Sequence, residues 1–570
     1  MRGDLVRKLT ARCLTVGLAV LAFLLLALTT ATWPGLLLSL AAVTAAVLER
    51  RVRPDAEVTA EFVLLLAGIL VAYHRQLGGG ADPALLATAP VALALLLLDA
   101  PLRRARSFEL RAVNLELPTR NPFVTSRFGH AVAVLLTGIA LCALVPLAAW
   151  WALLLTLLIA AAVGLSGLDL VLRRLRPSAT PDPVVAALKR HQPEFVLYFS
   201  APAGSEYQAT MWLPYLERIG RPFMVLVREA DHLAALAAAT TAPVVHSPTV
   251  RAVDQAIVPS LRVAFYVNHG AKNSHCLRFS RLTHIQLHHG DSDKTPSANP
   301  LTAIFDKVFV AGEAAVERYA RNGVHIPREK FVVVGRPQVE SITVVPAHRR
   351  PGRVTTVLYT PTWTGHNADA DYCSLPIAEE LLRRLLAREI TVILRPHPYT
   401  LQNPQSARQL ARLEELLAAD RDRSGRQHAW GATATRTWSL AECVNRSDAL
   451  ISDVSGVVSD YLYSGKPFAV TNMSAPPEDF TQEFPLSRAG YVLHRDLATL
   501  DRVLDDLLVT DPLAELRWST RSRYLGDFPA ESYADVFVSQ ARRFVTWQAP
   551  APRAGSANGE PGQQPHEIAR

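Results

Sequence analysis

Cysteine and charge are both scarce in this chain of 570 residues. Its five cysteines, Cys13, Cys142, Cys276, Cys373 and Cys443, form no Cys-x-x-Cys pair. This spacing excludes a disulfide framework and a cysteine-based zinc site. Charged residues make up only 19% of the chain, against 49% hydrophobic residues. Such a balance is too apolar for an ordinary soluble enzyme, so it predicts membrane-spanning segments.

The chain also lacks the interleaved basic and aromatic residues of a nucleic-acid-binding module, although its formal net charge is +8. In a membrane protein, arginines beside anionic lipid at the cytoplasmic face account for such a charge. We therefore expect membrane lipids, and no nucleic acid, among the partners.

The hydrophobic residues concentrate before about residue 173. Six apolar stretches can be drawn there, and several are shorter than the ~20 residues that cross a bilayer comfortably. They cover residues 14–31, 34–48, 60–74, 83–99, 129–148 and 150–172. The first resembles a signal peptide, but "TATWPG" is a poor cleavage site, so we expect a retained span. Residues 1–175 are thus predicted to be an α-helical membrane region of about six spans.

Basic residues predict how this region is oriented. They cluster at the N-terminus, in "ERRVRPDAE", before the fifth stretch and after the sixth. The intervening loops contain a single arginine, Arg75. The positive-inside rule then places both termini and the remainder of the chain in the cytoplasm. A transporter usually needs charge within its spans. These stretches contain almost none, so the region is predicted to be an anchor or a lipid-proximal platform.

From about residue 190, short apolar strands alternate with amphipathic helices. The alternation stops at the basic segment "VVPAHRRPGR" and then restarts. Alternating strands and helices indicate a parallel sheet covered on both faces. We predict an α/β fold with two Rossmann-like lobes, residues 190–340 and 352–545, and ligands bound at the carboxyl ends of the strands. Residues 548–570, rich in Pro, Gly, Ala and Gln, are predicted to be disordered.

Two adjacent histidines stand at the end of one predicted strand, in "THIQLHHGDSDKT". Strand alternation would send His288 and His289 to opposite sides, so a shared metal ion is not expected. A neutral imidazole that opens onto a cleft can take a proton from an alcohol. Lys294 could face a phosphate, and Asp291 or Asp293 could orient the histidine or bind an acceptor. A hydrated loop without chemistry is the alternative.

Two later segments contain groups that suit phosphate. In "VILRPHPYT", Arg395 and His397 follow an apolar strand, where a cationic side chain can meet phosphate oxygens. In "ALISDVSGVVSDYLYSGKP", Ser455 and Gly456 open a helix whose free amides form an anion site. The alternatives are an ordinary turn in the first segment and a simple helix cap by Asp453 or Ser455 in the second.

Further polar residues at strand ends are candidates to line the cleft. They come from "VVVGRP", from "VLYTPTWTG" and from the neighbourhood of the motifs above. The full set of pocket candidates is Asp291, Asp293, His288, Arg336, Thr360, Thr362, Asp453 and Lys466.

Taken in order, these segments resemble the CDP-glycerol glycerophosphotransferase family, whose members make or prime teichoic-acid-like polymers. The resemblance covers roughly residues 190–545 and rests on five motifs, such as "Q-x-W-H-G-x-x-x-K" and "Y-A-P-T-W-R". The matching segments are Gln286 to Gly290 with Lys294, Gly335 to Glu340, Tyr359 to Thr364, Leu394 to Pro398, and Ser452 to Gly456 with Asp460, Tyr461, Lys466 and Pro467.

The resemblance implies a GT-B-like fold and a phosphotransferase for substituted phosphate groups. An acceptor hydroxyl would attack the β-phosphorus of CDP-glycerol and release CMP. His289 would be the general base, His397, Ser455 and the amides around Gly456 would hold the pyrophosphate, and Lys294 could assist. The first lobe would take the acceptor and the second the donor. No cofactor and no metal ion is implied.

This chain departs from the family motifs at several positions. His288 stands in place of the Trp, Thr364 in place of the Arg, and Gly456 in place of the second Ser. Gln338 and Glu340 stand in place of an Arg and an Asp. These positions handle phosphate or acceptor, so the donor could be another CDP-polyol, such as CDP-ribitol.

We therefore expect a transferase of the cytoplasmic membrane in teichoic-acid-like polymer synthesis. It would move a polyol phosphate, glycerol phosphate foremost, from a CDP-polyol to a hydroxyl of a lipid-linked or cell-envelope glycan acceptor. One alternative is a GT-B glycosyltransferase that uses a nucleotide sugar. Another is a non-catalytic membrane scaffold with a degenerate transferase domain.

Overall fold

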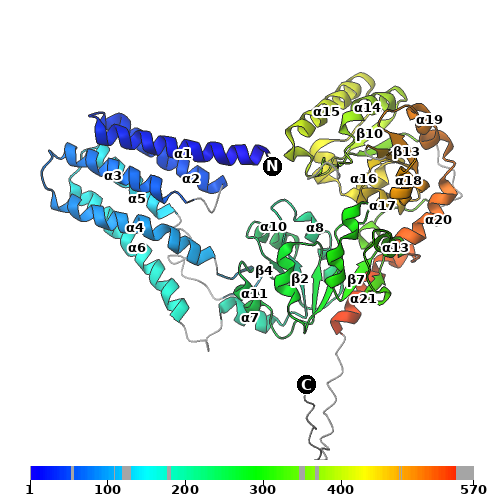
Figure 1. Ribbon diagram of the computed structural model, residues 1–570, viewed down its shortest axis with the longest axis horizontal. Coiled ribbons are helices and arrows are strands. Elements are labelled where there is room, and N and C mark those ends of the chain that lie inside the picture. Colours follow the sequence, from blue (N-terminus) through cyan, green and yellow to red (C-terminus); the bar gives the residue numbers. More distant parts are fainter. Residues whose placement is uncertain are drawn as a thin grey trace, which may run out of the picture.

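The computed structural model describes residues 2–52, 57–107, 109–117, 130–175, 182–345, 354–365, 371–473, 476 and 478–546. The tail predicted to be disordered, residues 548–570, lies outside this set. Within it, a region of long helices is followed by a region in which strands and helices alternate (Figure 1).

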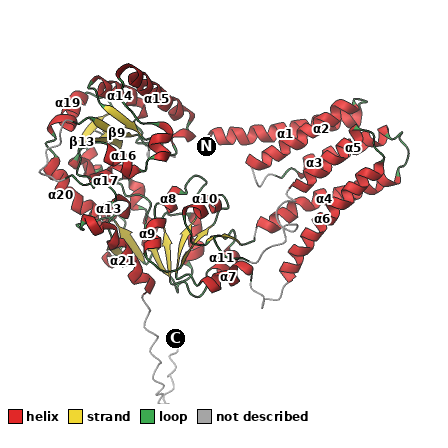
Figure 2. Ribbon diagram, turned by 180° about the vertical axis from the view of Figure 1, so that it is seen from behind, coloured by secondary structure: helices red, strands yellow, loops and turns green. Residues whose placement is uncertain are grey.

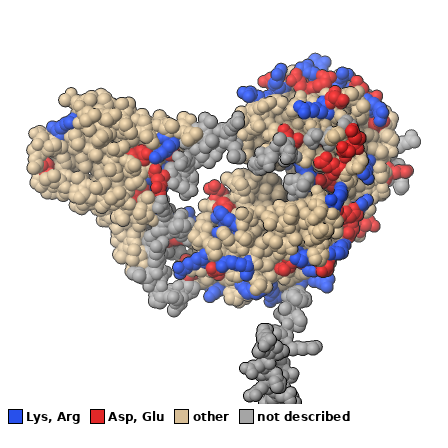
Figure 3. Space-filling view, viewed as in Figure 1, with Lys and Arg blue, Asp and Glu red and all other residues tan. Residues whose placement is uncertain are grey.

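Among the described residues, four helices are candidate membrane spans, against the six stretches drawn from the sequence. The helices of the helical region pack around a shared apolar core, and the surface of this region is largely uncharged (Figure 3). Helices α1, α2, α4 and α6 contain segments long and apolar enough to cross a membrane. The helices are α1 (Arg2–Leu28), α2 (Thr32–Val52), α3 (Thr59–Gln76), α4 (Pro83–Ser107), α5 (Ala131–Leu144) and α6 (Ala149–Leu175).

The other two helices, α3 and α5, do not reach the length and apolar composition of a candidate span, for different reasons. Helix α5 is apolar but has only 14 residues, or about 21 Å, against a hydrocarbon core of about 30 Å. Helix α3 has 18 residues but includes Glu61 near its start and His74 and Arg75 in its last turn. The four remaining helices associate the protein with a membrane.

Buried ion pairs lie among these helices, where the sequence predicted almost no charge. Arg12 meets Glu61 at 2.6 Å. Arg50 meets Asp99 at 2.7 Å, and Arg103 meets the same carboxylate at 3.1 Å. Every charge named here has a partner of opposite sign, which lowers the cost of burying it.

The α/β region contains two sheets, which confirms the prediction of parallel sheets. The first has the order β1-β4-β3-β2-β5-β6-β7-β8, and the second has the order β10-β9-β11-β12-β13. All pairings are parallel except that between β1 and β4. The strands are β1 (Arg111–Val113), β2 (Phe195–Phe199), β3 (Phe223–Val227), β4 (Val244–His246), β5 (Val263–Tyr266), β6 (Thr283–Gln286), β7 (Lys307–Val310), β8 (Phe331–Val333), β9 (Thr356–Thr360), β10 (Thr391–Leu394), β11 (Ala449–Asp453), β12 (Phe468–Asn472) and β13 (Tyr491–His494).

Helices cover both faces of each sheet (Figures 1 and 2). Strand β2 shows why, because all five of its residues are buried. Alternate residues enter separate cores: Phe195 and Leu197 pack on one face, and Val196 and Tyr198 on the other. The main helices are α7 (Pro183–His191), α8 (Tyr207–Thr210), α9 (Leu213–Arg218), α10 (His232–Ala239), α11 (Val250–Ala256), α12 (Ser274–Leu277), α13 (Glu313–Arg321), α14 (Ala378–Ala387), α15 (Pro404–Ser424), α16 (Leu440–Arg446), α17 (Gly456–Leu462), α18 (Phe480–Glu483), α19 (Leu500–Asp505), α20 (Ala514–Leu525) and α21 (Tyr533–Thr546).

Two segments join the first sheet from distant parts of the chain. Strand β1 belongs to the connection between α4 and α5 and pairs antiparallel with β4. Helix α21 returns from the end of the chain, and its Phe537 and Ala541 enter the core of the first sheet. Neither segment falls within residues 190–340, so the first sheet draws on more of the chain than its predicted boundaries.

Candidate active site

Segments that follow the carboxyl ends of strands in the two sheets contact one another. Ser205, which follows β2, lies 2.7 Å through its hydroxyl from the phenol oxygen of Tyr399, which follows β10. Near them the start of α17 approaches the loop after β6 closely: a Cβ added to Gly456 would lie 3.3 Å from the carbonyl oxygen of Asp291. A larger residue has little room there, which gives a physical reason for glycine at this position.

The backbone turns sharply at the paired histidines. His288 has a φ of +57°, a left-handed conformation that few non-glycine residues adopt. The imidazoles consequently point to different surroundings. The Nε2 atom of His288 lies 3.3 Å from the Tyr319 hydroxyl, whereas the Nδ1 atom of His289 lies 2.7 Å from the Val267 carbonyl oxygen. The two side chains diverge because of this turn, since both lie beyond the end of β6.

The contact with Val267 fixes the tautomer of His289. A carbonyl oxygen can only accept, so Nδ1 carries the proton and Nε2 keeps its lone pair. Burial lowers the pKa of His289 below its usual 6.5, so the ring is neutral at pH 7. His289 is therefore arranged as a proton acceptor.

His397 has the opposite arrangement. The backbone N–H of Tyr399 donates to its Nδ1 atom at 3.1 Å. Burial, with smaller contributions from Lys294 and His289, lowers the pKa of His397 to about 4. The neutral ring therefore carries its proton on Nε2, which makes His397 a hydrogen-bond donor.

A tyrosine lies between the two histidines. The ring of Tyr207, at the start of α8, stands edge-on to His289 and His397, with centroids 6.3 Å and 6.5 Å away. Trp363 stacks on His397 at 6.1 Å, and Tyr399 lies against the same histidine at 5.2 Å. Tyr207 and Tyr399 were missed in the sequence. Their only signal is that each follows a strand whose carboxyl end faces the cleft.

Lys294 extends from the first sheet toward the second. Its ammonium lies 4.8 Å from the ring centre of Tyr372. Burial lowers the pKa of Lys294, and the nearby carboxylates of Asp453 and Asp371 oppose this shift. Lys294 thus lies near His397 and Asp453.

Asp453 organises the loops at the edge of the second sheet. Its buried carboxylate accepts from the backbone N–H groups of Thr362 at 2.6 Å and Ser374 at 3.1 Å, and from the Thr471 hydroxyl at 2.7 Å. Burial raises the pKa of Asp453, and these hydrogen bonds oppose the shift. The carboxylate therefore holds the segment that follows β9, and strand β12 itself, beside the end of β11.

The remaining donor-side candidates surround this carboxylate. Thr360 and Thr362 are 5% and 4% exposed, so they lie beneath the surface at the carboxyl end of β9. The Ser455 hydroxyl lies 3.2 Å from that of Ser452, and Gly456 begins α17. No side chain caps the start of α17, where the first N–H groups of a helix have no partner in the preceding turn.

Several predicted site residues instead hold the structure together. Asp291 pairs with the buried Arg318. Asp293 lies 3.5 Å from the same guanidinium and accepts from the Leu486 N–H at 2.8 Å and the Tyr524 hydroxyl at 3.0 Å. These contacts tie the loop after β6 to α13 and to elements that follow β12. Both carboxylates are therefore engaged by protein groups rather than open to a substrate.

Three cations are likewise engaged by protein groups. Arg336 binds Asp460 through two hydrogen bonds, of 2.6 Å and 3.3 Å. Arg395 donates to the carbonyl oxygens of Ala434 and, at 2.9 Å, Trp438. Lys466 donates to the carbonyl oxygens of Val444 at 2.9 Å and Ser447 at 2.6 Å, at the end of α16. The charges of these three side chains are thus satisfied by protein groups.

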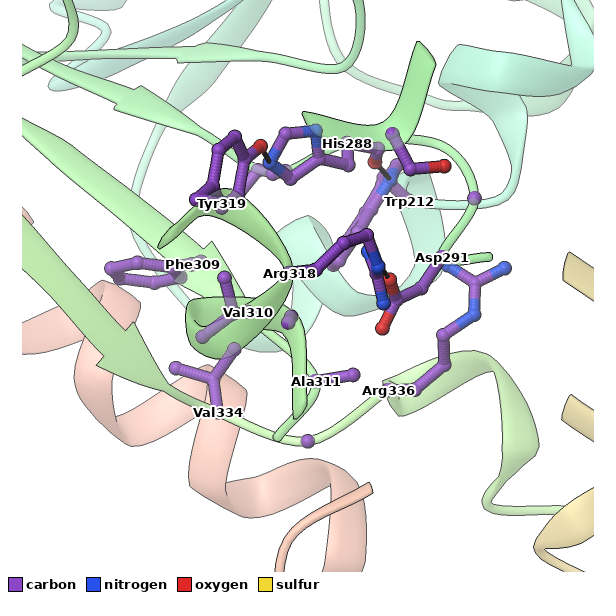
Figure 4. A pocket seen from close by; sticks show the side chains of 15 residues that line it. Trp212, His288, Asp291, Phe309, Val310, Ala311, Arg318, Tyr319, Val334 and Arg336 are labelled. Atoms are coloured by element: carbon purple, nitrogen blue, oxygen red, sulfur yellow. Dashed lines mark hydrogen bonds and ion pairs between the residues drawn. The ribbon is translucent and has the colours of Figure 1, made fainter. Parts of the chain in front are cut away.

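A small cavity lies beside the loop after β6, on the His288 side (Figure 4). His288, Tyr319, Arg318 and Trp212 line it. Its volume is about 30 Å³.

No described residues form a cluster of three or more His, Cys, Asp or Glu side chains able to hold a metal ion. The chemistry available to the described residues is therefore a proton acceptor at His289, a donor at His397, a cation at Lys294 and amides at the start of α17.

The two neutral imidazoles predict how activity depends on pH. A base works unprotonated, and the pKa of His289 lies below 6.5, so kcat/KM should fall only as the pH drops through that lowered value. At pH 6.5 the enzyme should retain more than half of its plateau value. A pH profile of kcat/KM for the free enzyme measures this. An acid limb centred above pH 6.5 would contradict the assignment of His289 as the base.

In open parallel α/β sheets, ligands bind outside the carboxyl ends of the strands. Residues 261–474 match the family model described as CDP-Glycerol:Poly(glycerophosphate) glycerophosphotransferase. This segment contains His289, His397 and Ser455, and the match confirms the resemblance predicted from the motifs. The chain is a transferase of the CDP-glycerol glycerophosphotransferase type.

Similar solved structures cover 61–63% of this chain. They include a glycosyltransferase from Rickettsia africae ESF-5 (TM-score 0.40, 12% identity, covering 62% of this chain and 99% of that one). The wall teichoic acid polymerase TagF has a TM-score of 0.39 and 15% identity, covering 62% of this chain and 89% of its own. An S. aureus MnaA–UDP complex has a TM-score of 0.41 and 12% identity, covering 63% and 99%. No curated protein matches the chain.

Proposed function

We propose that this protein transfers a polyol phosphate from a CDP-polyol to a hydroxyl of a lipid-linked or cell-envelope glycan acceptor. The observation that carries the proposal is the pair of neutral histidines with opposite tautomers, one on each side of Tyr207. One accepts a proton through Nε2 and the other donates through Nε2. In-line transfer of a phosphoryl group needs both functions in one cleft.

The reaction assigns a role to each group. The acceptor oxygen bonds to the β-phosphorus, and its proton passes to Nε2 of His289. The bond between that phosphorus and the oxygen bridging to the α-phosphate breaks, and CMP leaves with the bridging oxygen. His397 donates to a pyrophosphate oxygen, and the charge of Lys294 and the amides at Gly456 stabilise the developing negative charge. Positioning, rather than covalent catalysis, supplies the rate.

The fold suggests how the substrates divide between the two sheets. We place the acceptor with the first sheet, because His289 follows β6, and the donor with the second, because His397 and Ser455 follow β10 and β11. Each sheet would then form one lobe of a GT-B-like enzyme. Glycerol phosphate is the group we place first, and ribitol phosphate second, because Gly456 and His288 depart from the family motifs.

We further infer that the protein is a multi-pass protein of the cytoplasmic membrane, with its transferase region in the cytoplasm. Basic residues near the helix ends support this orientation. Strand β1 adds a constraint on the crossings. The connection between α4 and α5 lies in the same sheet as the strands that follow α6, so both lie on one side of the membrane, which requires α5 and α6 either both to cross it or neither.

The full chain in lipid nanodiscs tests the function. Wild-type protein supplied with radiolabelled CDP-glycerol or CDP-ribitol and membrane acceptors should release CMP and leave labelled phosphate in the product. Nucleotide sugars, tested in parallel, should give no transfer. Release of a nucleoside diphosphate together with transfer of a sugar would favour a glycosyltransferase instead. CDP binding without turnover would favour a scaffold.

A further inference from the structure

A strand of the first sheet comes from between two membrane-associated helices. Arg111, Ala112 and Val113 pair antiparallel with the three residues of β4. Only three residues separate Ser107, where α4 ends, from Arg111. At 3.3–3.6 Å per residue, those four steps of chain span at most about 14 Å. The edge of the sheet must therefore lie close to the end of α4.

One asparagine secures this strand. Asn114 has a φ of +58°, which asparagine tolerates better than most residues. Its amide nitrogen donates to the carbonyl oxygens of Ala237 at 2.9 Å and Thr240 at 2.7 Å, and lies 3.4 Å from that of Ala242. These carbonyls lie at the end of α10 and in the turn leading to β4. A side chain that is half exposed thus closes the last turn of a helix in the transferase region.

Apolar side chains reinforce the attachment. Leu110 is 8% exposed and belongs to the core beneath the first sheet. Leu115 and Leu117 pack against the same core, which also contains Leu188 of α7. The segment therefore has hydrophobic as well as hydrogen-bonded contacts on both sides of β1.

The position of the strand relates the membrane to the cleft. In Figure 1 the β4 edge is the part of the first sheet nearest the membrane helices. Strand β6, which leads to His289, is five places from β1 in the order of the sheet. At about 4.8 Å between neighbouring strands, His289 lies about 24 Å along the sheet from this edge.

We propose that β1 and Asn114 hold the cleft at a fixed distance from the bilayer, so that the enzyme takes an acceptor that is itself held in the membrane. This rests on the proposed function, and it adds the acceptor class and a positioning residue. The competing reading is that β1 only covers the edge of the sheet. In that case its loss would affect membrane-held and soluble acceptors equally.

Two matched probes separate these possibilities. Phosphatidylglycerol in nanodiscs presents a terminal glycerol in the membrane, and glycerophosphoglycerol presents the same headgroup in solution. Asn114→Asp places a carboxylate against three carbonyl oxygens while keeping a residue that tolerates positive φ. We expect it to lower kcat/KM for phosphatidylglycerol at least tenfold and to change kcat/KM for glycerophosphoglycerol less than twofold. Asn114→Gly, which keeps the backbone and removes the donor, should show the same split more weakly.

The controls make the outcome decisive. Asn322→Asp changes an exposed asparagine that donates to a carbonyl at the end of α13, and it should leave both probes unaffected. Hydrogen–deuterium exchange should increase at Val244–His246 in Asn114→Asp only. Equal losses on both probes, no loss on either, or unchanged exchange at β4 would overturn the proposal. A wild type that releases no CMP with either probe would overturn the proposed function, while the exchange at β4 would still test the attachment.

Discussion

Replacing His289 with asparagine is expected to lower kcat by about 10²–10⁴-fold, the usual contribution of a positioned general base. The asparagine amide can still donate to the Val267 carbonyl, as Nδ1 of His289 does at 2.7 Å. The variant should therefore keep its fold and lose only the lone pair at Nε2. Steady-state release of CMP measures the loss, and an unchanged thermal unfolding midpoint shows that the protein is intact.

The neighbouring histidine provides the matched control. His288→Asn removes a ring that contacts Tyr319 and lines the small cavity, so we expect less than a tenfold loss of kcat. The reverse result, in which His288→Asn abolishes turnover and His289→Asn does not, would show that the base has been assigned to the wrong member of the pair.

Breaking the buried ion pair between Arg336 and Asp460 is expected to have the largest effect on stability. Both side chains are nearly buried, at 6% and 7% exposed, and the pair joins the segment after β8 to α17. Arg336→Met leaves a buried carboxylate without its partner, which typically costs 3–5 kcal/mol in the free energy of unfolding. Chemical denaturation of the full chain in detergent, followed by the signal of the α/β region, measures this.

An exposed ion pair provides the comparison for the cost in the free energy of unfolding. Arg328 and Glu313 lie 2.5 Å apart with side chains 57% and 51% exposed, so Arg328→Met should cost about 1 kcal/mol or less. The double variant Arg336→Met with Asp460→Leu should recover most of the stability, because no charge is left buried without a partner. A cost for Arg336→Met equal to that for Arg328→Met would show that the buried pair contributes nothing particular.

The strands could be predicted because parallel sheets bury both faces of each strand. Continuous apolar runs such as "FVLYF" at β2 and "FMVLV" at β3 then stand out from the sequence. The same topology gathers His289, His397 and Asp453, since carboxyl ends of parallel strands lie at one edge. The strand pattern alone therefore indicates that the segments with these residues come together.

Other parts depended on tertiary contacts. Strand β1 is only "RAV", with two exposed residues, and it becomes a strand because β4 offers an unpaired edge. Arg395 and Lys466 stand near the expected phosphate site in sequence, yet their long side chains reach carbonyl oxygens instead. Sequence spacing predicts which Cα lies at the end of a strand. It does not predict which group the charged end of a long, flexible side chain will contact. Tyr207 lay outside every motif.

The pairing of β1 with β4 has a practical consequence for anyone who removes the membrane helices. A fragment that begins after residue 175 would lose β1, and the N–H and C=O groups of β4 that pair with it would face water along a short, apolar edge with the sequence "VVH". Open edges of this kind recruit strands from other molecules. Such a fragment should self-associate as its concentration rises, whereas one supplied with residues 109–117 as a separate peptide should remain monomeric.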